Sequence, residues 1–184
     1  MLMREQLAAI MPSAMSVRVG TYLLWLNEYM PQYDITTRLR QAAFLATIAE
    51  ESGQLLYTRE LWGPTPAQEQ YEPPSPKAAE LGNTEPGDGR RFKGRGLIQI
   101  TGRANYQAAQ DALGQPYVDE PILMQAPAEA TRTACWWWAT HGCNELADIP
   151  DFEAVTRRVN GGLTHYDRRK AYYEHALAAL QETT

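Results

Sequence analysis

Apolar residues recur at helical spacing through much of the first fifty positions. The pattern predicts one-sided amphipathic helices over residues 4–11 and 15–30, and a third helix over 37–51. Asp34 or Thr36 is a candidate N-cap for the third helix, since short polar side chains accept hydrogen bonds from the first turn. We expect this third helix to lie at the centre of the core.

The same periodicity returns in the second half of the chain. It predicts helices at 103–112, 127–141, 151–159 and 165–182. The second of these carries three consecutive tryptophans, Trp136–Trp138, which cannot all share one face of a helix. At least one is expected in the core and another toward the surface. The pattern favours one mainly α-helical domain over residues 1–184, with a small irregular or β region.

Between these helical halves, proline and glycine interrupt the chain repeatedly. Residues 63–66 and 72–76 contain several prolines, and residues 82–89 consist almost entirely of turn-forming types. A long excursion of this kind inside a compact domain is usually functional. We interpret it as a wall of a substrate cleft; the alternative is a flexible insertion that covers nothing.

The segment 97–101 after this excursion alternates in a way that predicts an extended strand. Gln99 and Thr101 would then project to one side, and two isoleucines to the other. The glycine that follows would turn the chain into a helix, from which Asn105 and Tyr106 could point back to the same space. Taken alone, the segment is equally compatible with a tight turn before a buried strand.

Composition narrows the class of protein. The chain has 184 residues, 44% hydrophobic and 21% charged, as expected of an ordinary globular domain. A net charge of −5 argues against a nucleic-acid partner, which requires a basic face. The same net charge does not favour binding of an anionic polymer either, so local groups would have to hold one.

The sequence contains no clear targeting signal and only two cysteines. The most apolar early segment, residues 22–26, is too short to span a membrane, and no signal peptide is recognised. We therefore expect cytoplasmic accumulation and no membrane insertion, with a separate factor releasing the protein if it acts outside. Cys135 and Cys143 are expected to be buried free thiols, although a disulfide is possible. No metal site and no cofactor are expected.

Two carboxylates have the character that glycoside hydrolysis needs. Glu50 and Glu51 are adjacent at a predicted helix end and point about 100° apart. Glu60 follows on a polar segment beyond a glycine break. A glycosidase uses one carboxyl group that stays protonated and one that is ionised. A carboxyl beside apolar residues keeps its proton more readily than one on a polar loop. Glu51 fits the first description and Glu60 the second, although charged residues at helix ends are usually just solvated.

Two motifs resemble those of a known family. The run GRGLIQITGRANY, Gly94–Tyr106, resembles the signature of glycoside hydrolase family 19, which holds plant-type chitinases and many phage endolysins of the lysozyme-like superfamily. The run Ala49–Gly53 resembles the family's His-Glu-Ser/Thr-Gly motif, whose glutamate is the general acid. That match falls on Glu51 and leaves Glu50 where the family usually carries histidine. The resemblance extends from about residue 36 to 175.

The resemblance also implies roles for other residues. Glu60 would be the second catalytic glutamate, ahead of Glu69 and Glu72, and the Thr101 hydroxyl would help to hold the attacking water. Substrate-binding positions are expected, from the resemblance and from the pattern above, at Gln99, Asn105, Tyr106, Asn160 and Arg168, with Arg169 a close rival of Arg168 as the arginine near the carboxylates.

The function implied is hydrolysis of β-1,4 bonds between N-acetylated amino sugars in a lysozyme-like cleft between the helical body and residues 60–106. An inverting mechanism places the two carboxyl groups roughly 6.5–9.5 Å apart. We expect a monomeric, endolysin-like enzyme that acts on peptidoglycan of the periplasmic wall after release by a separate pore-forming protein. An exported antibacterial effector would look similar.

Alternatives remain at this point. A chitinase, a sugar-binding module that lost catalysis through the change at Glu50, and a metal-dependent amidase are the other readings. A lack of metal-ligand spacing counts against the amidase. Which of the alternating bonds is cut and which host wall is preferred stay open.

Overall fold

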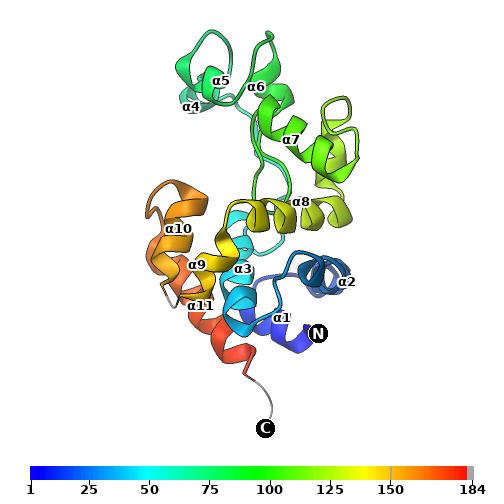
Figure 1. Ribbon diagram of the computed structural model, residues 1–184, viewed down its shortest axis with the longest axis vertical. Helices are drawn as coiled ribbons and strands as arrows, with labels where there is room; N and C mark the ends of the chain where they lie inside the picture. The colour runs from blue at the N-terminus through cyan, green and yellow to red at the C-terminus, as the bar shows by residue number, and fades with distance from the viewer. Residues whose placement is uncertain (150, 182–184) are drawn as a thin grey trace. The chain divides into compact units, whose positions relative to one another are not determined.

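The computed structural model describes residues 1–149 and 151–181, and it is mainly α-helical, as predicted (Figure 1). The described residues form two compact units. The helical unit comprises Met1–Leu56 and the described residues from Ala134 onward, and the central unit comprises Tyr57–Thr133. In the described part of the chain, no helix is both long and apolar enough to cross a membrane. The expectation that residues 1–184 act as one catalytic domain stays a prediction.

The helical unit contains most of the helices that the sequence predicts, together with one short helix, Cys143–Asp148, that the sequence analysis did not predict. They are α1 (Arg4–Ile10), α2 (Ser16–Gln32), α3 (Arg38–Glu51), the end of α8 (Pro127–Thr140), α9 (Cys143–Asp148), α10 (Phe152–Asn160) and α11 (Tyr166–Ala179). Helix α3 is the centre of this unit, because every residue from Ala42 to Ala49 is buried. Such a helix is apolar on all sides and needs partners all round. Its partners include α11 and the Trp138 ring, which packs edge-on against the Phe44 ring with the two ring centroids 5.3 Å apart.

The N-cap of α3 is Thr37, and neither Asp34 nor Thr36, which the sequence favoured, has this role. The Thr37 hydroxyl accepts a hydrogen bond from the Arg40 amide at 3.2 Å. Asp34 instead takes a left-handed conformation, with φ of 57°. The sequence could not separate three neighbouring polar residues, because each can cap and only the position where the helix begins decides among them.

Replacing Thr37 by alanine should lower the free energy of unfolding by about 1 kcal/mol, because one amide of the first turn loses its acceptor. Urea unfolding followed by circular dichroism measures this change. Thr36→Ala is the matched control, since the described structure records no side-chain hydrogen bond at Thr36, which lies exposed beside it. Equal losses in the two variants would contradict the assignment of the cap.

The aromatic and thiol predictions for the α8 region are confirmed. Trp138 is fully buried and donates a hydrogen bond from Nε1 to Asn144 at 2.9 Å, whereas Trp137 is partly exposed and stacks on His141. Cys135 and Cys143 are both free and buried. Burial raises the pKa of the Cys143 thiol to about 12, so both cysteines belong to the packed core and have little thiolate character.

The central unit folds around short helices and buried polar side chains. Its elements are α4 (Pro66–Glu69), α5 (Pro76–Glu80), α6 (Asp88–Arg91), α7 (Arg103–Leu113), the 3₁₀ helix η1 (Pro121–Gln125) and the start of α8. Asn83 is buried, accepts from the Arg103 amide at 2.8 Å and donates to the Tyr71 carbonyl at 2.8 Å. These buried polar contacts lie beside an apolar core that includes Phe92, Leu97 and Met124, and the excursion is an ordered substructure.

The predicted strand at 97–101 is wrong. Arg95 and Ile100 form a β-bridge, and the four residues between them make a tight turn. Gly96 has φ of 80° and Gln99 has φ of 57°, values that an extended strand does not contain. Leu97 and Ile98 are both buried. Periodicity misled because a short apolar run is buried equally well in a turn and in a strand.

Candidate active site

The predicted site residues fall on both units. In the helical unit, Glu51 is the last residue of α3, and its Oε1 lies 2.7 Å from Nη2 of Arg169 on α11. The Arg169 side chain is only 5% exposed and that of Glu51 is 19% exposed. Arg169 is further fixed by a hydrogen bond from Nε to the Thr164 carbonyl at 3.1 Å. Buried Glu51 Oε1 makes close ionic contact but no well-aligned hydrogen bond within the described structure.

Glu50, the residue before it, has a separate arginine. Arg168 donates from Nε to Glu50 Oε2 at 2.6 Å and from Nη2 to Oε1, and His165 Nδ1 lies 3.2 Å from Oε1. Burial pushes the pKa of Glu50 upward, but the Arg168 hydrogen bond and the charges of Arg168, Arg169 and His165 outweigh burial and hold the pKa below 4.5. Arg169, the rival in the sequence reading, is thus the arginine on Glu51, and Arg168 is the arginine on Glu50.

The Glu50–Arg168 pair should make stability depend on acid pH. Because the pKa of Glu50 is lower in the folded chain, its stabilisation is fully present above the unfolded pKa and is lost as pH falls through the folded pKa. We expect Arg168→Gln to lower the melting temperature near neutral pH and to lower it much less at acid pH, below the folded pKa of Glu50. Arg157→Gln is the control, since Arg157 forms an exposed pair with Glu153 on one helix. A deficit in Arg168→Gln that stays constant with pH would contradict the pairing.

Asn160 is the last residue of α10 and is exposed. Gly161 follows with φ of 70° and ends the helix. The chain then reaches His165 and Arg168 at the start of α11. The predicted Asn-Gly-Gly motif is therefore a helix end that leads into the segment next to Glu50, and the Asn160 side chain is open to solvent.

In the central unit, Glu60 is held by two hydrogen-bond donors. Its Oε2 accepts from the Gly94 amide at 3.0 Å, and its Oε1 accepts from Gln68 Nε2 at 2.8 Å. The Glu60 amide donates in turn to the Gly94 carbonyl at 2.8 Å. The two contacts fix both oxygens of the Glu60 carboxyl group in position. Gln68 is only 5% exposed, so this orientation is built into the unit.

Gln99 and Thr101 meet Glu60 around Gly94. A Cβ placed on Gly94 would lie 2.9 Å from Gln99 Oε1 and 3.3 Å from Thr101 Oγ1, so the close approach requires glycine. The Thr101 hydroxyl donates to the Gln99 carbonyl at 3.0 Å. Asn105, exposed in the first turn of α7, donates to the Thr101 carbonyl at 2.8 Å. The expectation that Gln99 and Thr101 share one space is met, by a turn and not by a strand.

Tyr106 does not fit the predicted contact with substrate. The residue has 0% exposure, its hydroxyl donates to the Lys93 carbonyl at 2.7 Å and accepts from Arg95 Nη1 at 2.8 Å. Burial raises the pKa of this hydroxyl. Adjacent residues of a helix point about 100° apart, so the Tyr106 ring is buried where Asn105 is exposed. The Tyr106 hydroxyl binds the Lys93 carbonyl and so supports the loop that carries Gly94.

Gln68 was missed in the sequence. It is the third residue of α4, and its side chain returns to the Thr65 amide at 2.9 Å, completing a capping box. The run Thr65-Pro66-Ala67-Gln68 signals such a helix start. Nothing in that signal shows that Nε2 of Gln68 would bind Glu60, because that contact depends on how the loop folds.

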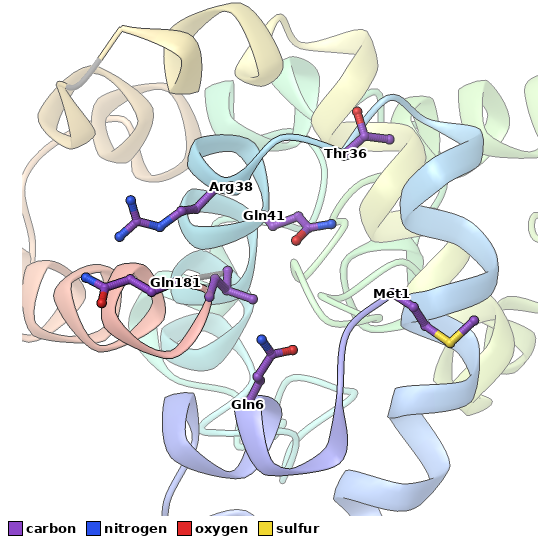
Figure 2. Close-up of a pocket in the computed structure, with 7 residues that line it drawn as sticks. Met1, Gln6, Thr36, Arg38, Gln41 and Gln181 are labelled. Carbon is purple, nitrogen blue, oxygen red and sulfur yellow. The ribbon is translucent and has the colours of Figure 1, made fainter. Parts of the chain in front are cut away.

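A polar hollow of about 670 Å³ in the helical unit lies elsewhere (Figure 2). Residues lining it include Met1, Gln6, Thr36, Arg38, Gln41 and Gln181. Arg38 begins α3 and Glu51 ends it, so the two side chains are separated by about 20 Å of helix. No predicted catalytic or substrate-binding residue is among those that line this hollow.

Each of the two glutamates has its own set of partners within its own unit. Glu51 is a poorly solvated carboxyl beside one buried arginine, and Glu60 is a carboxylate fixed by two donors next to a hydroxyl and an amide. Two carboxyl groups with different partners are the residue types that general acid–base chemistry requires.

Comparison with known proteins identifies the family. The family model described as Chitinase class I matches residues 28–155. A Haemophilus influenzae protein described as glycosyl hydrolase family 19 domain-containing is 34% identical over an aligned length of 159 positions, and the alignment covers 74% of this chain and 78% of that protein. An Arabidopsis thaliana endochitinase is 37% identical over an aligned length of 138 positions, and the alignment covers 73% of this chain and 44% of the plant protein. The chain thus spans less than half of the plant enzyme.

Solved structures show the same fold. A bacterial family 19 chitinase has a TM-score of 0.71 and 25% identity, with 97% of this chain and 94% of that chain covered. Chitinase C from Streptomyces griseus has a TM-score of 0.75 and 24% identity, with 99% and 77% covered. At that identity, the second likeness speaks for the fold alone.

Proposed function

Because the chain belongs to glycoside hydrolase family 19 and is a chitinase-like glycosidase, we propose that it is an endolysin-like enzyme that hydrolyses bacterial peptidoglycan. The bonds cleaved are β-1,4 linkages between N-acetylated amino sugars, and the mechanism is inverting. The observation that carries this proposal is the contrast between the two carboxylates, Glu51 beside buried Arg169 and Glu60 between two hydrogen-bond donors.

In this mechanism Glu51 donates a proton to the glycosidic oxygen. Glu60 accepts a proton from the attacking water, and the Thr101 hydroxyl helps to position that water. The cluster around Gly94 supports this assignment, since it brings the Glu60 carboxylate, the Thr101 hydroxyl and the Gln99 amide together. Arg169 stabilises the carboxylate that Glu51 becomes after proton transfer.

Several polar side chains would bind the sugar. Gln99 and Asn105 present amides that suit hydroxyl and N-acetyl groups, and Asn160 offers an exposed amide on the helical unit. Arg168 would affect the site indirectly by holding Glu50, because the Arg168 guanidinium is bound by the Glu50 carboxylate. Tyr106 contributes only by supporting the Gly94 segment.

The catalytic residues do not distinguish peptidoglycan from chitin. Both polymers contain β-1,4-linked N-acetylated amino sugars, so the same acid and base serve either. The bacterial family 19 relative is matched over 78% of its length, while the Arabidopsis endochitinase is matched over 44% of its own. Chitin hydrolysis is the second candidate, and the likeness to endochitinases favours it.

Mass spectrometry of digested, purified sacculi beside digested chitin oligomers tests the substrate. New reducing N-acetylmuramic acid ends would make the protein a muramidase, and reducing N-acetylglucosamine ends a glucosaminidase. If chitin is cleaved and sacculi stay intact, the protein is a chitinase and the peptidoglycan proposal is wrong. Binding without new reducing ends from either polymer would leave a sugar-binding module.

We also propose that the protein accumulates in the bacterial cytoplasm and reaches the periplasmic wall through a separate pore-forming protein, acting there as a monomer. Induction in a bacterial host with and without a co-expressed pore-forming protein tests release. Lysis should require both proteins. Lysis by this chain alone would contradict the dependence on a pore.

A further inference from the structure

A second hollow, which the proposed reaction does not use, lies in the central unit. It has a volume of about 620 Å³, and its charged lining consists of Glu85, Asp88, Arg90, Arg91, Arg95 and Arg103. We call it the basic hollow. Four guanidinium groups face two carboxylates there, although the whole chain carries a net charge of −5. The local sign is therefore opposite to that of the protein.

One of the four arginines is already neutralised. Arg103 donates to Asp88 from Nε at 2.7 Å and from Nη2 at 2.5 Å. Asp88 is 2% exposed and also accepts from the Thr84 amide at 2.9 Å and the Glu85 amide at 3.1 Å. Its carboxylate is fully used by these partners, so it has little capacity left to balance another cation.

Arg95 is the unusual member of the set. It is 8% exposed, and no carboxylate in the described structure pairs with it. Its Nη1 donates to neutral acceptors, the Arg91 carbonyl at 2.6 Å and the Tyr106 hydroxyl at 2.8 Å, and buried Nε has no hydrogen-bond partner. A buried cation without a counter-ion is costly unless an anion completes its surroundings.

Arg91 and Arg90 form no ion pair in the described structure, although the Glu72 carboxylate lies at this segment and accepts from the Gly87 amide at 2.8 Å and the Arg90 amide at 3.2 Å. Arg91 Nη2 donates to the carbonyls of Val118 and Asp119 at 2.9 and 3.1 Å, again neutral acceptors. Arg90 is exposed. Nearby Lys93 has a lowered pKa, first because of burial and then because of the positive charges of neighbouring arginines. The basic hollow is thus a region of positive potential that attracts anions.

From these contacts we infer that the basic hollow binds the carboxylates of the stem peptide that peptidoglycan carries on its muramic acid. This inference rests on the proposed function. Chitin carries no charge, so only peptidoglycan offers an anion to these guanidinium groups. Exposed Glu85 at the rim gives the lining both signs, which suits a peptide with carboxylates and an amine better than a polyphosphate.

The chain places this hollow within reach of the reacting polymer. Gly94, whose amide binds Glu60, directly precedes Arg95, and adjacent Cα atoms are about 3.8 Å apart. Arg95, which lines the hollow, and the amide that binds Glu60 therefore belong to consecutive residues of the central unit. The site would then distinguish peptide-bearing glycan from bare glycan.

Calorimetry with the Glu51→Gln protein tests the inference without hydrolysis of the ligand. The ligands are a peptide-bearing peptidoglycan fragment and the same fragment with its carboxylates converted to methyl esters. We expect esterification to weaken binding about tenfold, the value of one charge-assisted contact. The difference should shrink as salt rises, because the groups are partly solvated. Equal affinities for the two ligands would overturn the inference.

Arg90→Glu in the same background identifies the site. The exposed Arg90 side chain makes no hydrogen bond and no ion pair in the described structure, so its reversal should leave the fold intact, and Arg90→Gln is a milder second variant. Both should reduce the difference between acid and ester, whereas Arg157→Glu on the exposed face of α10 should not. An undiminished difference in the Arg90 variants would show that the carboxylates are bound elsewhere and would overturn the assignment.

The proposed function is tested separately by the wild-type protein. Failure of wild-type protein to cleave sacculi would contradict the substrate, whatever the Glu51→Gln protein binds. Cleavage of sacculi combined with equal binding of acid and ester would leave the substrate standing and remove the basic hollow from its recognition.

Discussion

Glu51→Gln is expected to abolish turnover of sacculi and of chitin oligomers while leaving the helical fold intact. Glutamine has nearly the same shape but cannot donate a proton to the leaving oxygen. Loss of a general acid costs about 10²–10⁴-fold in rate. Release of reducing ends measures the loss, and far-ultraviolet circular dichroism checks the fold.

The neighbouring carboxylate supplies the matched control for this variant. Glu50 precedes Glu51, is less exposed and pairs with Arg168 in place of Arg169. Glu50→Gln should keep most of the activity and lose stability instead, because Arg168 is left without its counter-ion. If Glu51→Gln remains active and Glu50→Gln does not, the acid has been assigned to the wrong residue of the pair.

Glu60→Gln is expected to reduce turnover by about 10²–10⁴-fold, the usual contribution of a general base. One amide oxygen also cannot accept from both Gly94 and Gln68 as the two carboxylate oxygens do. Glu69→Gln is the control, since Glu69 is an exposed carboxylate on α4 close in sequence. Similar losses in both variants would argue for a general disturbance of the central unit.

Azide separates a catalytic role of Glu60 from a structural one. A small anionic nucleophile needs no base, so adding azide to Glu60→Ala should restore turnover and yield a glycosyl azide of inverted configuration. No rescue, combined with a normal melting temperature, would contradict the assignment of Glu60 as the base.

The helices were predictable because their signals are local. Eight consecutive buried residues in α3 come from a run of alanines and larger apolar side chains that is visible in the chain. The N-cap required the structure: three polar residues close together can each cap, and Thr37 does so because the helix begins after it. The residue at which a helix begins therefore depends on the folded backbone and cannot be read from the residue types alone.

The cluster around Gly94 was predicted for the wrong reason. Gln99 and Thr101 were expected together on a strand, but a turn with positive φ at Gln99 brings them to Gly94. Alternation describes which way side chains point only after the backbone is known to be extended. Tyr106 shows the same limit, because the ring that looked like a substrate contact is buried against Arg95.

The sequence by itself determined the helical class, the family resemblance and the two glutamates of the proposed chemistry. These follow from short-range patterns and from residue types that a motif carries. Only the tertiary structure decided which arginine serves which glutamate, that Gln68 and the Gly94 amide hold Glu60, and that Arg95 is buried without a counter-ion. Each of these depends on contacts between residues far apart in the chain or within folded loops. Such contacts are set by packing and by the pairing of buried charges, which no local pattern records.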